Sequence, residues 1–181
     1  MPASNRKPFT LLKRFCADSK AAAAVEFAMI AMPLIFMIVS LLEVGLIFLV
    51  SLTLDNATDI AAREVRTGQV TNANTSEAQF EQLICNNMGW LSGSCTSSLS
   101  VEAQTFTTFS LAATDVATSQ VKNGVVSTSL PYVMGGGSQI QVVRVFYDWP
   151  LVAPLLNPSL STLGNGDALL TYAAVFRNEP F

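Results

Sequence analysis

The stretch that decides the fold is KAAAAVEFAMIAMPLIF, from Lys20 to Phe36. It opens an apolar run that extends to about Leu54 and contains only two charged residues, Glu26 and Glu43. Because a bilayer is crossed by about 20 apolar residues, the run is long enough to span a membrane. It is too long for the apolar part of a secretory signal, and no small-x-small cleavage site follows it. The sequence therefore predicts one membrane-spanning helix.

The charges on the two sides of this run differ in sign. Five of the ten basic residues lie in the first twenty positions, whereas the chain after Lys20 carries five basic and twelve acidic residues. The positive-inside rule then predicts a cytoplasmic N-terminus and a translocated body. A nucleic-acid-binding arm is the alternative interpretation of the basic head. We expect no nucleic-acid partner, because the acidic body would repel phosphate.

A helical pattern continues beyond the membrane run. Apolar residues recur at spacings of four and three on one helical face, at Val50, Leu54, Ala57, Ala61 and Val65. Gly68 is a natural stop signal, so we expect one helix from about Ala21 to Arg66. Asp59 and Arg63 stand at i and i+4, a spacing that predicts an ion pair.

The rest of the chain mixes helix and strand signals. Ser76 and Gln79 resemble a capping box, and they open a second amphipathic helix that ends at Gly89. β-branched and alternating apolar residues predict three strands, at Leu99–Ala103, Gln139–Trp149 and Ala168–Arg177. The segment 105–133 has no clear secondary-structure assignment. The segment 150–160 is compatible with a short helix between its prolines.

The three cysteines divide between the two compartments. Cys16 falls on the cytoplasmic side, where thiols stay reduced. Cys85 and Cys95 fall outside, between the second helix and the first strand, where either a disulfide or two buried thiols fit the sequence. A bridge there would stabilise the fold by roughly 2–3 kcal/mol on loop-entropy grounds.

The sequence contains no histidine, the commonest general base and a frequent metal ligand. Ser119 and Lys122 form an isolated S-x-x-K spacing without the other motifs of acyl-serine enzymes. We therefore expect no enzymatic activity, no cofactor, no metal and no small-molecule substrate. Binding or assembly is the expected role.

Glu26 is the anomaly in the membrane run, because a lone carboxylate in hydrocarbon costs on the order of 3 kcal/mol. The simplest explanation is that Glu26 lies near the headgroups. A basic leader, small residues and Val-Glu-Phe before a long apolar helix also resemble the processing site of type IV prepilins. That resemblance implies cleavage by a prepilin peptidase between Ala21 and Ala22, with Glu26 and Phe27 following in the mature chain. The new ammonium on Ala22 would neutralise the carboxylate of Glu26.

More narrowly, the sequence resembles the TadE-like family, the pseudopilins of Tad (Flp) pilus systems. The resemblance rests on AAAAVEFAMIAMPLIF, EVGLIF and LDNATDIAAREVRTGQV, with weaker likeness in VVRVFYDWPL and VFRNEPF. One departure is Ala21, where the family pattern has glycine before the cut. The resemblance implies a pilin-like α+β fold, in which a transmembrane helix continues into a domain with a second helix and an antiparallel sheet. Pro33 is expected to kink that helix.

The implied domains are a basic leader (1–21), a transmembrane helix (22–50) and an extracytoplasmic TadE-like domain (51–181). The implied role is a minor pilin, held in the bacterial inner membrane with its C-terminal domain in the periplasm. Its partners would be the membrane, the prepilin peptidase and other pilin-like subunits of the Tad pilus, which it would contact through the N-terminal helix. A membrane-anchored binding module of the cell envelope is the alternative. The sequence leaves open whether the protein enters the filament.

Overall fold

In the computed structural model, the described residues are 19–127, 129–152 and 159–181, and side chains are described from residue 22 onward. The chain divides into two compact units, Met1–Leu42 and Glu43–Phe181. Helix α2, Ser19–Arg66, contributes to both. We call residues 22–42 of this helix its exposed half and residues 43–66 its domain half. The described residues do not include most of the predicted leader or Cys16. They also leave out residues 153–158, where the sequence offered a short helix as an option.

Helix α2 ends where the sequence predicts. The N–H of Gly68 donates to the carbonyl of Val65, and Gly68 has a φ of +76°, which a residue with a Cβ rarely adopts. The predicted apolar face is buried, with Val50, Ala57, Ala61 and Val65 at 0% exposure. This face therefore belongs to the core of the second unit.

Three short helical segments follow α2. Helix α3, Glu77–Asn87, begins with the predicted capping box, in which Ser76 and Gln79 bond each other's backbone N–H groups. The 3-10 turn η1, Gly89–Leu91, and helix α4, Ser92–Cys95, then lead to the first strand. Both capping hydrogen bonds satisfy N–H groups that the helix itself leaves free.

The predicted strands form one antiparallel sheet in the order β1-β4-β5, with the bounds Leu99–Phe106, Ile140–Trp149 and Ala168–Arg177. The register places Val101 opposite Val145 and Val143 opposite Ala174. The segment without a clear assignment holds helix α5, Phe109–Val116, and a small hairpin of β2, Val121–Lys122, and β3, Val125–Val126. The predicted α+β fold is confirmed.

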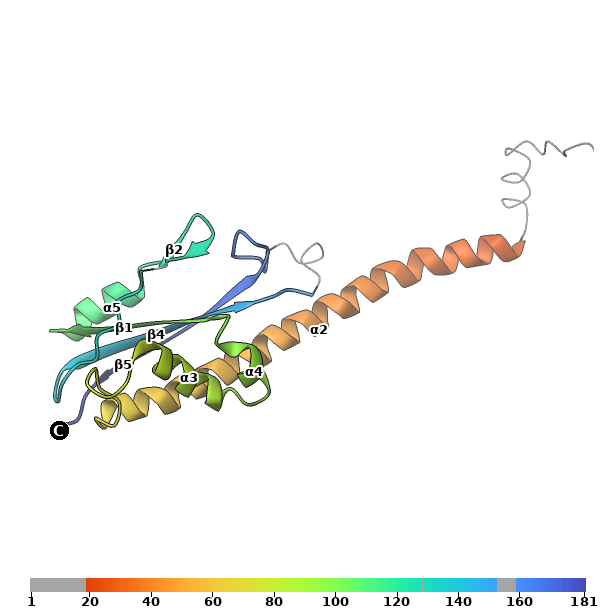
Figure 1. The fold of residues 1–181 in the computed structure, drawn as a ribbon. Helices are drawn as coiled ribbons and strands as arrows, with labels where there is room; N and C mark the ends of the chain where they lie inside the picture. The colour runs from red at the N-terminus through yellow and green to blue at the C-terminus, as the bar shows by residue number, and fades with distance from the viewer. Residues whose placement is uncertain (1–18, 128, 153–158) are drawn as a thin grey trace, which may run out of the picture. The chain divides into compact units, whose positions relative to one another are not determined.

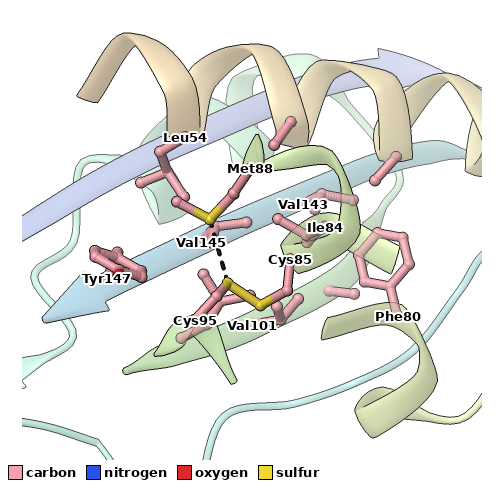
Figure 2. Close-up of a cluster of buried hydrophobic side chains, with 14 of the residues drawn as sticks. Leu54, Phe80, Ile84, Cys85, Met88, Cys95, Val101, Val143, Val145 and Tyr147 are labelled. Atoms are coloured by element: carbon pink, nitrogen blue, oxygen red, sulfur yellow. Dashed lines mark hydrogen bonds between the residues drawn. A yellow bond between two sulfur atoms is a disulfide. The ribbon is translucent and has the colours of Figure 1, made fainter. Parts of the chain in front are cut away.

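The two faces of the sheet carry different layers (Figure 1). The domain half of α2 and helix α3 cover one face and enclose the main apolar core. Figure 2 shows this core around Leu54, Met88, Val143 and Val145. Helix α5 covers part of the other face, where Ala112 packs with two β4 residues, Ile140 and Val142. The sheet thus lies between a large apolar layer and a smaller one.

Candidate assembly site on the N-terminal helix

The exposed half of α2 carries a nearly continuous apolar surface. Phe27 and Met29 are each 74% exposed, and Ile30 is 71% exposed. Soluble proteins rarely expose contiguous apolar surface on this scale, so these side chains require lipid or another protein around them. By length and composition, the helix from Ala22 to Arg66 can cross a membrane.

Glu26 interrupts this surface, and its side chain is exposed on the helix. Ala22 lies four residues earlier, so the two residues share one helical face about one turn apart. The bond between Ala21 and Ala22 falls in the first turn of α2, whose leading N–H groups have no partners within the helix. A new N-terminus at Ala22 would therefore be close to the Glu26 carboxylate.

The other two notable residues of the apolar run have different environments. Pro33 lies inside α2, which continues on both sides of it, although proline offers no N–H to the carbonyl of Met29. The predicted kink at Pro33 stays a prediction. Glu43, the second charge of the run, does not lie at an exposed surface. Its side chain is 2% exposed within the second unit and interacts with a neighbouring group.

Cys85 and Cys95 lie beneath the domain half of α2. Cys85 of α3 and Cys95 of α4 form a disulfide with their Cα atoms 5.5 Å apart, and both are fully buried. Figure 2 shows the bridge beside Met88, whose sulfur is 3.2 Å from that of Cys95. The bridge therefore joins the second helix to the segment that leads into the sheet.

A buried charge cluster on the opposite face of the sheet was missed by the sequence analysis. The Nε atom of Arg144 on β4 lies 2.9 Å from a carboxylate oxygen of Glu102 on β1. An NH2 nitrogen of the same guanidinium lies 2.7 Å from Asp115 of α5, and another nitrogen donates to the carbonyl of Thr118. Because Arg144 and Glu102 are almost completely buried, their pairing offsets the cost of removing both charges from water.

This cluster is a structural link between α5 and the sheet. Two amide side chains, Gln104 and Gln120, also donate to the remaining oxygen of Glu102. The sequence signal was a charge within each of two otherwise apolar stretches, Glu102 in β1 and Arg144 in the middle of β4, which the register places directly opposite each other. Neither strand reveals the pairing by itself.

Other expectations about polar residues have mixed outcomes. Asp59 and Arg63 do not form the predicted ion pair, since Asp59 instead accepts a hydrogen bond from the Tyr172 hydroxyl at 2.8 Å. Burial, followed by the nearby Asp59 carboxylate, raises the pKa of Tyr172 to about 12. The S-x-x-K residues Ser119 and Lys122 are both exposed, and the Ser119 hydroxyl accepts from the N–H of Val121.

A search of residues 19–127, 129–152 and 159–181 finds no cluster of three or more His, Cys, Asp or Glu residues that could hold a metal.

Comparison with known protein families gives one match. Residues 21–63 match the model of a family described as TadE-like protein. The match covers the exposed half of α2 and most of its domain half, so the predicted family resemblance is confirmed over this segment. No curated protein and no solved structure matches the chain. A role in association with the Tad pilus is the function that the family match supports.

Proposed function

We propose that this chain, with its TadE-like segment at residues 21–63, is a minor pilin or pseudopilin needed for assembly of the Tad (Flp) pilus. The observation that carries the proposal is the exposed apolar half of α2 with the single carboxylate of Glu26 on it. The protein is held in the bacterial inner membrane by one span. Its N-terminus is cytoplasmic and its C-terminal domain is periplasmic.

The carboxylate of Glu26 is better explained by a subunit that packs beside other helices than by a membrane anchor alone. An anchor has no need for a carboxylate that raises the cost of insertion by on the order of 3 kcal/mol. A subunit that packs beside other helices gains from it, because an ammonium group can pair with the carboxylate in a low-dielectric environment. The prepilin peptidase would supply that ammonium by cutting before Ala22. The ammonium that pairs with Glu26 then belongs to the same subunit or to a neighbouring one.

The domain half of α2 supports the same account. Its buried face is filled by α3 and the sheet, so lateral packing in the membrane is left to residues 22–42 and to the exposed apolar side chains that follow them, such as Phe48 at 66% exposure. The folded domain then caps or primes the growing filament.

The test is the variant Glu26→Leu, expressed in a strain whose own copy is deleted. We expect normal membrane insertion, a folded periplasmic domain and no pili, because the carboxylate is removed while hydrophobicity rises. Met29→Leu is the matched control, since Met29 is 74% exposed on the same half and carries no charge. Normal piliation of Glu26→Leu would remove the reason for preferring assembly over anchoring.

The processing step has a separate test. N-terminal sequencing of the membrane-extracted protein should begin at Ala22, with a shift to the uncut chain in a strain that lacks the prepilin peptidase. A mature chain that begins at Met1 or Pro2 would contradict cleavage and would leave Glu26 without its proposed ammonium partner in the same subunit.

A further inference from the structure

The two ends of the second unit differ in charge. At one end, Arg66 of α2 pairs with Glu179 behind β5, and the N–H of Glu179 donates to the carbonyl of Arg66. Three other segments of the unit contain no Asp, Glu, Lys or Arg: 44–54 of α2, 88–99 around η1 and α4, and 149–152 at the end of β4. These segments form the opposite end, which we call the uncharged end.

The contacts between α2 and β5 fix the position of the uncharged end. Asp59 of α2 accepts a hydrogen bond from Tyr172 of β5, and further along both elements Arg66 meets Glu179, so α2 and β5 run in the same direction. Ala168 lies four residues before Tyr172, which is about 13 Å of strand and equals about nine residues of helix. The start of β5 is therefore level with the turn of α2 near residue 50.

The other two segments lie at the same level. Trp149 of β4 pairs with Ala168, and Tyr147 pairs with Leu99 of β1. Trp90 of η1 packs edge-on against Trp149, with ring centroids 6.4 Å apart. In Figure 1, α4 accordingly lies beside the part of α2 that enters the domain. Both tryptophans of the chain thus belong to the uncharged end.

Each of the three segments exposes a large apolar side chain. Trp90 is 60% exposed, Val152 is 74% exposed and Phe48 is 66% exposed. Their neighbours Trp149 and Ile47 instead pack against the main core, which fixes the positions of the exposed groups. Apolar surface that is gathered from three segments at one end of a domain marks a contact with lipid or with another protein.

The charged residues that flank these segments do not cover the exposed groups. Asp55 follows segment 44–54 on the side of Asp59, away from the uncharged end. Asp148 precedes Trp149, but side chains alternate along a strand, so it points to the other face of the sheet. There it lines a pocket with Gly124. The three segments also carry no basic residue, so a partner at this end is recognised by apolar contact and not by ion pairs.

We propose that the uncharged end of the domain rests on the surface of the bilayer, with Trp90 at the level of the lipid headgroups. An indole ring suits this boundary, because it combines a large apolar surface with one N–H donor. The proposal rests on the membrane span of the proposed function. Residues 22–42 of α2 are about 30 Å long, the thickness of the hydrocarbon core, and they lead directly into residue 43 of the domain.

The test uses the intrinsic fluorescence of the full chain, because its two tryptophans both lie at this end. The protein is reconstituted at low density in phosphatidylcholine vesicles whose acyl chains are brominated either near the headgroup or near the chain ends. We expect fluorescence to be lost in brominated lipid, and more of it with bromine near the headgroup. Trp149→Phe should keep this pattern, which assigns it to Trp90. Equal emission in brominated and ordinary lipid, or a larger loss with bromine near the chain ends, would overturn the proposal.

Two valine variants locate the contact on the domain. Val152→Glu places a carboxylate at the uncharged end and should roughly halve the fluorescence loss, because a charge is costly to bring into the interface. Val175→Glu is the matched control, since Val175 is 39% exposed near the other end of β5. We expect no change for the control. Equal losses in the two variants, with unaltered unfolding midpoints, would contradict the site.

Alkaline extraction of the same vesicles separates failure of this proposal from failure of the proposed span. A chain without a span would be released, whereas a spanning chain whose domain stays in water would remain in the vesicles with unquenched tryptophans. Quenching that requires added anionic lipid would also overturn the proposal, because the three segments carry no basic residue. Tryptophans that are shielded from both lipid and aqueous iodide would show a second copy at this end instead of the bilayer.

Discussion

The exposed and domain halves of helix α2 differ in where their large apolar side chains lie. In the exposed half, Phe27 and Met29 point away from the chain and are 74% exposed. In the domain half, Leu54 and Val65 are almost fully buried under the sheet. One continuous helix thus provides a surface for other molecules and a surface for its own fold. The difference predicts that equivalent substitutions in the two halves fail in different ways.

The largest expected effect is on a matched pair of leucines. Leu54→Ala should lower the free energy of unfolding of the domain by about 2–5 kcal/mol, because it leaves a cavity in the main core. Leu41→Ala should leave that free energy unchanged, since Leu41 is 64% exposed in the first unit. Denaturant unfolding of the detergent-solubilised protein, followed by tryptophan fluorescence, measures both. Similar losses in the two variants would contradict the division of α2 into two surfaces.

The disulfide beneath the domain half should have a smaller effect. Replacement of both Cys85 and Cys95 by alanine is expected to lower the free energy of unfolding by roughly 2–3 kcal/mol, because the unfolded chain regains loop entropy. Chemical reduction of the unaltered protein should bring its unfolding midpoint toward that of the double variant. Labelling of both Cys85 and Cys95 as free thiols in the non-reduced protein would show that the bridge does not form in the cell.

The smallest effect concerns the hydrogen bond that joins β5 to the domain half. The pKa of Tyr172 is raised to about 12 in the folded domain, above the ordinary value of 10.0, first by burial and then by Asp59. The folded state therefore holds this proton more tightly than the unfolded state. The resulting stability is fully present below pH 10 and is lost as pH rises toward 12.

Tyr172→Phe should accordingly flatten the fall in stability between pH 10 and 12, as measured by unfolding at a series of pH values. Asp59→Asn keeps the phenol but removes the neighbouring charge. It should lower the pKa of Tyr172 only partway, because burial is the larger cause. A fall in stability identical in all three proteins would show that Tyr172 does not link the sheet to α2.

Much of this arrangement follows from local patterns. The spacing of Val50, Leu54 and Ala57 predicts the buried face of α2, and the pair Ser76 and Gln79 predicts the start of α3. The strands follow from runs rich in β-branched residues. In these runs apolar residues either alternate with polar ones or occupy both faces of the strand. These features depend on neighbours in the sequence, so one chain is enough to predict them.

The missed features depend on contacts between distant segments. Arg144 meets Glu102 only because β1 and β4 pair in one particular register, and Asp115 joins them from helix α5. The expected pair of Asp59 and Arg63 fails for the same reason. Instead, the hydroxyl of Tyr172, 113 residues away in sequence, donates a hydrogen bond to the Asp59 carboxylate. Neither the partner strand nor its register is encoded in a local pattern.

The central claim is that the exposed half of α2 packs against other pilin-like helices. The most direct measurement is photo-crosslinking in piliated cells, with a benzophenone amino acid in place of Phe27. The same replacement of Phe109, which is 50% exposed on α5, is the control because it also substitutes one aromatic ring for another. We expect a protein adduct with a pilin-like subunit from Phe27 and none from Phe109. Adducts with lipid alone from Phe27 would contradict it.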